Sequence, residues 1–319
     1  MVIYMAMEKK IWEQNIPCDA VLIRRLQKPA GQIDVVLDTD TYNEIDDQFA
    51  LSYMIRNEEK LNVKAIYAAP FFNEKSVSPK DGMEKSFDEI LTLLSLLGRT
   101  DLNASVFKGS ETYLHDEETP VPSPAASDLA VRAMQYTPEN PLYVIAIGAI
   151  TNVASAILLN PDIRERIVIV WLGGNAYHWT DNREFNLGQD VAAARIVFGC
   201  GVPLVQLPCM GVVSAFSISE PEFRSYFLGK SPLCDHLAQY AIEEGRRTAA
   251  SETWTRVIWD VTAVAWLLDG DFMADTLVHS PIPQYDHTWT PSSTRHFIRY
   301  VYAIHRDRLL ADLVHKLAK

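Results

Sequence analysis

Short apolar runs alternate with segments of helical periodicity over most of the chain, and this alternation constrains the fold more than any other sequence feature. Runs typical of buried strands occupy residues 33–37, 61–68, 105–107, 143–146, 167–172 and 203–207. Apolar residues recur at helical spacing after residue 47, from near residue 151, and over residues 83–97, 191–198, 231–244 and 261–268. This βαβ rhythm predicts an α/β fold with an open, mainly parallel sheet and helices on both faces.

The domain organisation follows from chain length and from the position of the first strand signal. The chain has 319 residues, of which 48% are hydrophobic and 22% charged, so it can bury a large core. No strong strand signal precedes Ile33, and the most loop-like stretch is residues 111–127. We expect one domain over residues 1–319, with residues 1–32 as an N-terminal extension.

Charge and hydropathy exclude several classes of partner. The formal net charge of -12 argues against binding a phosphate backbone, so no nucleic-acid partner is expected. The longest apolar stretches, residues 142–150 and 167–172, are far too short to span a membrane. The N-terminus lacks the apolar core of a secretory signal, which predicts a cytoplasmic protein. The four cysteines lack metal-ligand spacing, so we expect reduced and mostly buried thiols.

An acidic cluster follows the first strand in the stretch VVLDTDTYNEIDDQFAL, which contains Asp38, Asp40, Glu44, Asp46 and Asp47. Ligands of parallel sheets gather at the carboxyl ends of the strands, where these residues fall. Carboxylates this close repel one another unless a cation lies among them, and a hard divalent ion with oxygen ligands suits them. The alternative is a solvated acidic turn in which Asp46 caps a helix.

The acidic cluster resembles the signature of the inosine-uridine preferring nucleoside hydrolases, in which a hydrophobic strand is followed by DxDPGxDDxxAL. Where that family has Pro-Gly, this chain has Thr41-Tyr42-Asn43-Glu44, so its loop is two residues longer. Three further segments are similar to the family in order and approximate spacing. They are IGAITNVASAILLNP, WLGGNAYHWTDNREFNLGQD and VIWDVTAVAWLLD, which resemble GPLTNIA, an MGG stretch followed by EFN, and HDPxAVAxxLDP. The resemblance covers roughly residues 33–273.

The resemblance implies a Rossmann-like nucleoside hydrolase fold and calcium-dependent hydrolysis of the N-glycosidic bond of ribonucleosides. It implies that Ca²⁺ is held by Asp40, Asp47, Asp260 and the backbone carbonyl of Thr151, and that Asp40 is the general base. The residues that it implies for the small-molecule ribonucleoside are Asp46, Asn43, Leu172, Glu184 and Asn186, with Leu172 at a position usually held by Met. It also implies a homodimer or homotetramer.

The group that eases the base away is a separate question, because Trp259 replaces the His that usually precedes the last Asp. In purine-preferring relatives a tryptophan stacks on the base, so Trp259 is a candidate catalytic residue and indicates purine preference. The alternative is a tryptophan packed in the core. His178, Asn182 and Tyr177 are other conceivable proton donors.

Two other functions fit part of the sequence. VVLDTDT also fits the DxDx(T/V) motif of haloacid-dehalogenase-like phosphatases, and GDFMAD at residues 270–275 mimics their late acidic motif. Against this class, residues 261–268 have a helical pattern where that motif needs a strand. The second alternative is a non-catalytic ribose or nucleoside sensor built on the hydrolase fold, because the acidic loop is altered and the usual His is lost.

Overall fold

The central element of the structure, a computed structural model that describes residue 10 and residues 16–318, is an eight-stranded sheet. Its strand order is β3-β2-β1-β4-β5-β6-β12-β9. All neighbouring pairs are parallel except β12 and β9. The mainly parallel sheet predicted from the sequence is therefore confirmed. The strands are β1 (Ile33–Thr39), β2 (Leu61–Ala68), β3 (Val106–Lys108), β4 (Leu142–Ala146), β5 (Ile167–Leu172), β6 (Leu204–Leu207), β9 (Met273–His279) and β12 (Phe297–Ile304).

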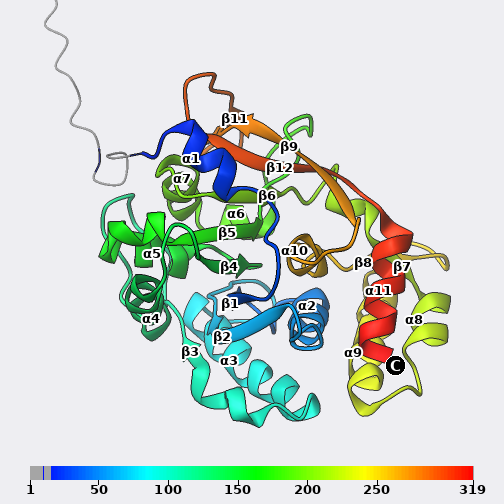
Figure 1. The fold of residues 1–319 in the computed structure, drawn as a ribbon. Coiled ribbons are helices and arrows are strands. Elements are labelled where there is room, and N and C mark those ends of the chain that lie inside the picture. The colour runs from blue at the N-terminus through cyan, green and yellow to red at the C-terminus, as the bar shows by residue number, and fades with distance from the viewer. Residues whose placement is uncertain (1–9, 11–15, 319) are drawn as a thin grey trace, which may run out of the picture.

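Helices cover both faces of this sheet, because successive residues of a strand point to opposite sides. In β1, Val35 and Leu37 belong to one hydrophobic core and Val36 belongs to the other. The first core is completed by α2 (Ile45–Ile55), α3 (Pro79–Leu96), α9 (Pro232–Thr248), α10 (Val261–Trp266) and α11 (Arg306–Ala318). The second is completed by α4 (Pro124–Arg132), α5 (Thr151–Leu159) and α7 (Val191–Gly199). Figure 1 shows these two groups on opposite sides of the sheet.

Three helices each begin at a Ser-Pro sequence, and two of these starts differ from the predicted boundaries. Ser78, Ser123 and Ser231 each accept a hydrogen bond from a backbone N–H in the first turn, and proline follows directly. α3 therefore begins at Pro79 rather than at residue 83. The predicted loop at residues 111–127 ends where α4 begins, at Pro124.

Several elements were not predicted. They include the strands β9 and β12, the helices α1 (Asp19–Arg25), α6 (Phe185–Gln189), α8 (Glu220–Tyr226) and α11, and the pairs β7–β8 (Ser217–Ser219 and Thr255–Val257) and β10–β11 (Ile282–Pro283 and Trp289–Thr290). Figure 1 shows α8, α9 and α11 grouped beyond α2 and α10, close to the C-terminus. β7 and β8 pack against this group, and β8 leads into the segment before α10.

Part of the predicted N-terminal extension is attached to the domain. Residues 1–9 and 11–15 lie outside the described residues, but α1 packs near the sheet. The buried Arg25 donates hydrogen bonds through Nη2 to the carbonyls of Glu165, at 2.6 Å, and Ile167, at 3.2 Å. The end of the extension is thus tied to the start of β5.

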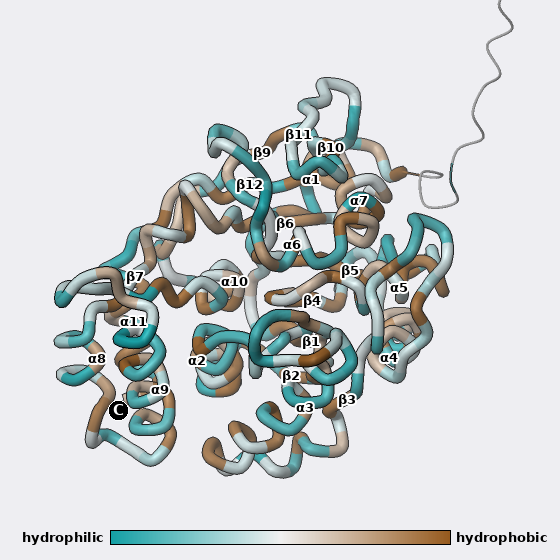
Figure 2. The backbone as a smooth tube through the Cα atoms, turned by 180° about the vertical axis from the view of Figure 1, so that it is seen from behind, coloured by the Kyte–Doolittle hydropathy of each residue, from teal (hydrophilic) through white to brown (hydrophobic). Residues whose placement is uncertain are grey.

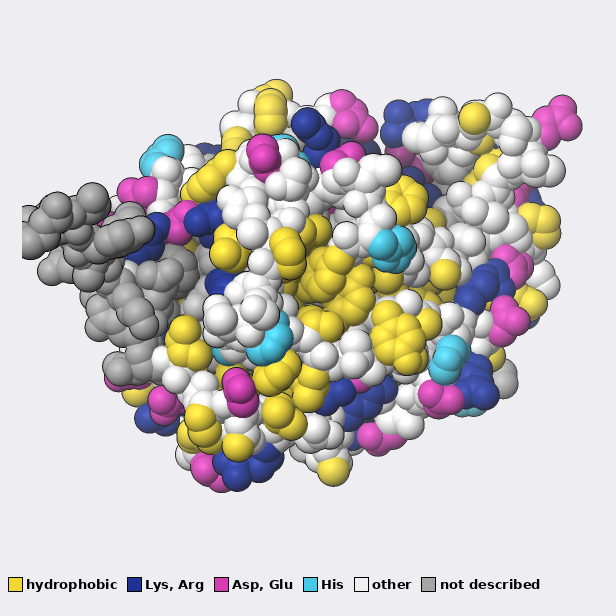
Figure 3. Space-filling model, turned by 90° about the horizontal axis from the view of Figure 1, so that it is seen from above, with side chains coloured by type: hydrophobic (Ala, Val, Ile, Leu, Met, Phe, Trp, Pro, Cys, Tyr) yellow, Lys and Arg dark blue, Asp and Glu magenta, His cyan; other side chains and the backbone are white. Residues whose placement is uncertain are grey.

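None of the helices in residues 16–318 is both long and apolar enough to cross a bilayer. In Figure 2 the brown, apolar stretches run through the central strands, while teal predominates on the peripheral turns. On the face in Figure 3, lysine and arginine side chains are scattered among acidic ones around an apolar centre. This face therefore has no basic stripe of the kind that binds a phosphate backbone.

His296, just before β12, makes a pH-dependent contribution to stability. It is 6% exposed, and neither ring nitrogen has a hydrogen-bond partner among the described residues. Burial, with Arg295 and His279 nearby, lowers the pKa of His296 from 6.5 to about 4. Between these values the unfolded chain binds a proton that the folded chain does not, so acid destabilises the fold.

We expect His296 to remove about 3 kcal/mol of unfolding free energy as the pH falls from 6.5 to 4. His296→Leu should abolish this part of the pH dependence and leave stability above pH 7 nearly unchanged. Urea unfolding of both proteins across this pH range measures the difference. Parallel pH profiles of the two proteins would contradict the assignment.

Candidate active site

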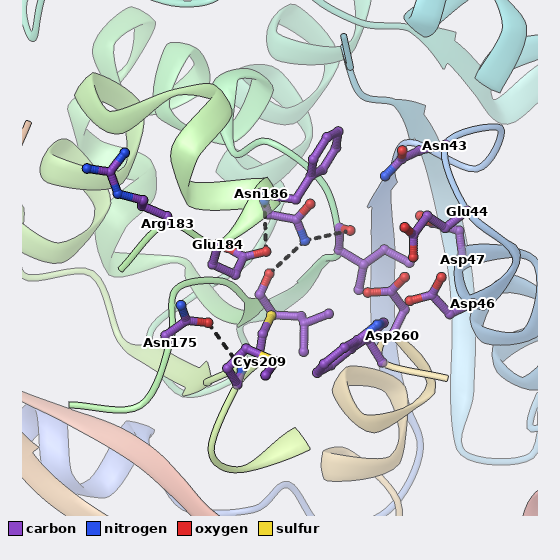
Figure 4. A pocket seen from close by; sticks show the side chains of 15 residues that line it. Asn43, Glu44, Asp46, Asp47, Asn175, Arg183, Glu184, Asn186, Cys209 and Asp260 are labelled. Atoms are coloured by element: carbon purple, nitrogen blue, oxygen red, sulfur yellow. Dashed lines mark hydrogen bonds between the residues drawn. The ribbon is translucent and has the colours of Figure 1, made fainter. Parts of the chain in front are cut away.

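A cavity of about 240 Å³ opens at the carboxyl ends of the central strands. Its walls come from the loops that follow β1, β4, β5 and β6 and from the segment that leads into α10. This is the edge at which parallel sheets bind ligands. The lining residues are Asn43, Glu44, Asp46, Asp47, Ile147, Leu172, Asn175, Arg183, Glu184, Phe185, Asn186, Cys209, Met210, Trp259 and Asp260 (Figure 4).

One wall of the cavity is a cluster of three aspartates. Asp46, Asp47 and Asp260 each offer an oxygen that lies within 4.8 Å of the oxygens of the other two. Asp46 and Asp47 are in the first turn of α2, and Asp260 stands at the N-cap position of α10, against which α2 packs. The carboxylate of Asp260 makes no capping hydrogen bond to the backbone of α10, so capping the helix does not use its oxygens. The structure thus brings together three of the acidic residues that the sequence analysis singled out.

Asp40 lies beside this cluster without lining the cavity. Both of its carboxylate oxygens are buried and have no hydrogen-bond partner among the described residues. Asp40 Oδ1 is 3.0 Å from the point where a Cβ on Gly148 would be, so an alanine there would crowd the carboxylate. Gly148 is therefore a site residue that the sequence analysis missed, although the glycine of the IGAITN segment was the available signal.

Burial makes the whole cluster hard to ionise. It raises the pKa of Asp40, Asp47 and Asp260 well above the usual range, and repulsion from neighbouring carboxylates adds to the effect. Burial also raises the pKa of Asp46. Within the described part of the chain, one oxygen each of Asp46 and Asp260 has no hydrogen-bond partner, like both oxygens of Asp40. Buried carboxylates in this condition are stabilised by a cation.

The donor set fits a hard divalent cation. Calcium binds oxygen ligands at about 2.3–2.6 Å, so ligands on opposite sides of the ion are about 5 Å apart. The mutual spacing within 4.8 Å of Asp46, Asp47 and Asp260 satisfies that limit. The donors of this aspartate cluster are all oxygens, which favours calcium or magnesium over softer metals.

Thr151 is fully buried as the first residue of α5 and does not line the cavity. Its hydroxyl donates to Asp190 Oδ2 at 2.7 Å. Asp190 also accepts from the backbone N–H of Leu114 and Ala193, so it joins three segments beneath the site. The role of the Thr151 backbone carbonyl as a metal ligand stays a prediction.

The opposite wall presents hydrogen-bond acceptors. The Glu184 carboxylate accepts from the backbone N–H groups of Gly174, Asn186 and Leu187, each at 2.8 Å. Asn186 Nδ2 donates to the carbonyls of Ile147 and Leu172, both at 3.0 Å. With both amide protons engaged, Asn186 has Oδ1 left for a ligand. The two side chains are therefore held rigidly, and they suit a ligand that donates through hydroxyl groups.

The longer acidic loop forms the rim above the aspartates. Asn43 Oδ1 accepts from Asn73 Nδ2 at 2.6 Å, which leaves the amide nitrogen of Asn43 turned toward the cavity (Figure 4). Glu44, the residue before α2, accepts from Arg256 Nη2 at 2.6 Å. The structure places both Asn43 and Glu44 in the lining of the cavity.

Of the four candidates for assisting base departure, Trp259 alone lines the cavity. Tyr177 donates its hydroxyl to Gln206 at 2.6 Å and stacks on Tyr300. Asn182 accepts from the backbone of Asn175 through its side chain, and His178 is exposed. Trp259 is only partly buried, so the alternative of a fully packed core tryptophan does not describe it.

Several lining residues were not identified from the sequence. Asn175 and Cys209 follow β5 and β6, and their position after a strand at the ligand-binding edge was the available signal. Burial raises the pKa of the Cys209 thiol well above its usual value, and nearby Glu184 adds to the effect. Cys18, Cys200, Cys209 and Cys234 are all unpaired and all but Cys18 are buried, as predicted.

The phosphatase alternative does not fit this geometry. The segment before residues 270–275 contains α10, a helix where that reading needs a strand. Asp38, the first aspartate of that motif and therefore its nucleophile, is fully buried, accepts a hydrogen bond from Asn152 Nδ2 at 2.8 Å and does not line the cavity.

Sequence comparison gives 28% identity over 264 residues to the pyrimidine-specific ribonucleoside hydrolase RihA of Escherichia coli O1:K1 / APEC, or 74% of this chain and 79% of that protein. The RihA of Citrobacter koseri is 28% identical over 176 residues, which cover 47% of this chain and 55% of that protein. Among solved structures, the purine-preferring ribonucleoside hydrolase from Gardnerella vaginalis matches with a TM-score of 0.74 at 19% identity, covering 89% of this chain and 98% of that one.

The plant nucleoside hydrolase PpNRh1 matches with a TM-score of 0.72 at 18% identity, covering 91% of this chain and 99% of that one. These two likenesses show the fold. The sequence model described as "Inosine-uridine preferring nucleoside hydrolase" matches residues 35–296, a range that includes both walls of the cavity. The chain therefore belongs to the inosine-uridine preferring nucleoside hydrolase family, and it is an enzyme of the N-glycosidase class.

Proposed function

We propose that the protein hydrolyses the N-glycosidic bond of ribonucleosides to ribose and free base in a calcium-dependent reaction. The observation that carries this proposal is the pairing of two walls in one cavity. Partnerless carboxylate oxygens of Asp46 and Asp260 face the acceptor groups of Glu184 and Asn186. A polyhydroxylated ring fits between a cation-binding wall and an acceptor wall.

Asp40, Asp47, Asp260 and the backbone carbonyl of Thr151 would hold the calcium ion. When bound, Ca²⁺ would coordinate ribose hydroxyls and orient a water molecule for attack on C1′. The partnerless oxygens of Asp40 and Asp260 support this assignment, while Asp46, which the structure also brings within 4.8 Å of Asp47 and Asp260, is left for the substrate. The all-oxygen donors of the aspartate cluster and the resemblance in sequence support calcium as this ion.

Different residues would stabilise the charge on the ribose, accept the proton of the water and bind the ribose hydroxyls. Cleavage builds positive charge on the ribose ring, which the carboxylates nearby stabilise. Asp40 would take the proton of the attacking water, as a buried carboxylate with a raised pKa is suited to do. Asp46 would accept from the ribose 2′-hydroxyl, while Glu184 and Asn186 fix the remaining hydroxyls. Asn43 and Leu172 complete the substrate contacts.

The base would lie against Trp259. Stacking on the indole would favour a purine, with solvent supplying the proton to the leaving base. The relatives differ in this respect, because RihA is named pyrimidine-specific and the Gardnerella enzyme purine-preferring. The proposal for this chain rests on Trp259 and its place in the cavity.

Trp259→Ala should lower kcat on inosine about tenfold while KM changes by less than about twofold, because stacking assists departure more than it assists binding. Steady-state kinetics on inosine and uridine measure both constants, and the loss should be larger for inosine. Trp179→Ala is the matched control, since Trp179 is exposed and does not line the cavity. Unchanged kcat in Trp259→Ala would rule out this role.

The function itself is tested by following inosine through its ultraviolet absorbance. The protein treated with chelator and refilled with Ca²⁺ should convert inosine to hypoxanthine and ribose, and the chelated protein should not. If the calcium-loaded protein binds inosine without cleaving it, the non-catalytic sensor alternative is correct. The predicted homodimer or homotetramer stays a prediction, as does the cytoplasmic location.

A further inference from the structure

The two halves of the aspartate cluster come from distant parts of the chain. Asp46 and Asp47 begin α2, whereas Asp260 begins α10. Their separation depends on how the segments before the two helices are held against each other. A cation site is sensitive to such spacing, because each ligand must lie at a defined distance from the ion.

One ion pair joins these two segments directly. Arg256 Nη2 donates to Glu44 Oε2 at 2.6 Å, and the two residues are 212 positions apart in the chain. Glu44 immediately precedes α2, and Arg256 lies in β8, four residues before Asp260. The Arg256 side chain is 18% exposed and that of Glu44 is 41% exposed, so the pair is partly shielded from water.

The ion pair also fixes the part of the acidic loop that departs from the family pattern. Residues Thr41 to Glu44 replace a short Pro-Gly turn, so contacts must hold the loop in place of a rigid backbone. Lys75 Nζ donates to the carbonyl of Asn43 at 2.9 Å and anchors the loop on one side. Arg256 anchors it on the side that carries Asp260.

Strand β8, which carries Arg256, is held in place by backbone hydrogen bonds. It pairs antiparallel with β7, where Arg256 lies opposite Ile218. The backbone N–H of Ile258 donates to the carbonyl of Phe216 at 3.0 Å, which continues the attachment toward Asp260. The position of the Arg256 side chain is therefore coupled to the start of α10 through a short, hydrogen-bonded segment.

We propose that the Glu44–Arg256 ion pair is a positioning clamp that sets the distance between Asp46–Asp47 and Asp260, and thereby sets the affinity of the site for its cation. The inference rests on the proposed metal site. Neither residue is assigned as a metal ligand, so both act through the aspartates that follow them. The clamp holds the end of the longer loop, at Glu44, against the segment that leads to Asp260.

A clamp and a simple charge effect predict opposite results for Arg256. Arg256→Gln removes a positive charge near the site, so electrostatics alone would make a cation bind more tightly. Loss of the clamp would make it bind more weakly. Glu44→Gln weakens cation binding under both explanations. Glu44→Asp distinguishes them, because it keeps the negative charge but shortens the side chain that reaches Arg256. A clamp predicts weaker binding in this variant, and a simple charge effect predicts no change.

The experiment is calorimetric titration of Ca²⁺ alone into the chelated full-length protein. Arg256→Gln, Glu44→Gln and the double variant should each raise the Kd about tenfold, to the same extent, because all three break one contact. Glu44→Asp should also raise it. Arg99→Gln is the matched control, because Arg99 pairs with Glu58 and Asp101 on the exposed surface, and it should leave the Kd unchanged.

Tighter or unchanged binding in Arg256→Gln would overturn the proposal, as would single effects that cancel in the double variant. Circular dichroism and thermal melting establish that each variant is folded. If Arg256→Gln does not fold, Glu44→Asp decides, because unchanged affinity there contradicts a clamp. Failure of the unsubstituted protein to bind Ca²⁺ would count against the proposed metal site instead.

Discussion

Asp40→Asn is expected to lower kcat on inosine about a thousandfold. The substitution keeps an oxygen at the position of the carboxylate but removes the group that would accept the proton from water. Asp40 is buried, both of its oxygens lack partners, and its pKa is raised by burial and by neighbouring carboxylates. Single-turnover measurements at saturating Ca²⁺ separate the loss of the base from weaker metal binding.

Asp38→Asn is the matched control, because Asp38 lies two residues away in the same buried segment. Asp38 Oδ1 accepts from Asn152 Nδ2 at 2.8 Å, and an asparagine side-chain oxygen can accept the same bond. Burial raises the pKa of Asp38 to about 7, so the neutral form is already populated near neutral pH. Its kcat should stay within about threefold of the unsubstituted value. Equal losses in the two variants would show that Asp40 acts only through the fold.

Inosine should be cleaved at least about a thousandfold more efficiently than 2′-deoxyinosine, measured as kcat/KM. A site built to accept from a hydroxyl leaves a buried polar group unpaired when that hydroxyl is missing. The partnerless Oδ1 of Asp46 is the proposed acceptor for the 2′-hydroxyl. Asp46 is 3% exposed, so solvent compensates little for the lost contact.

Asp46→Ala should remove most of this discrimination, because the two substrates would then lose the same contact. The expected change is a fall in kcat/KM for inosine with little change for 2′-deoxyinosine. Comparable rates for inosine and 2′-deoxyinosine in the unsubstituted protein would contradict the proposed role of Asp46.

Much of the site could be predicted because parallel strands place their carboxyl ends along one edge. Asp46 and Asp47 follow β1, so the alternation of strands and helices was enough to place them at this edge, whereas Glu184, which follows β5, was identified through the sequence resemblance. Asp260 could be added only through the sequence resemblance, since its helix contributes no strand to the sheet. The structure brings its carboxylate to the other two.

The rest depends on contacts that periodicity does not encode. β9 is an edge strand whose residues are mostly half-exposed, and α6 has five residues, so neither has a distinct apolar pattern. The space that Gly148 provides for Asp40 and the pairing of Glu44 with Arg256 arise from residues distant in the sequence. Local patterns cannot identify such partners.

Calcium titration of the chelated protein, carried out in parallel on the unsubstituted chain and on Asp260→Asn, tests most directly whether distant carboxylates share one cation. The account predicts that the unsubstituted chain takes up one Ca²⁺ and that Asp260→Asn loses this binding while remaining folded. Uptake of Ca²⁺ by Asp260→Asn with unchanged affinity, or no uptake by the unsubstituted chain, would contradict it.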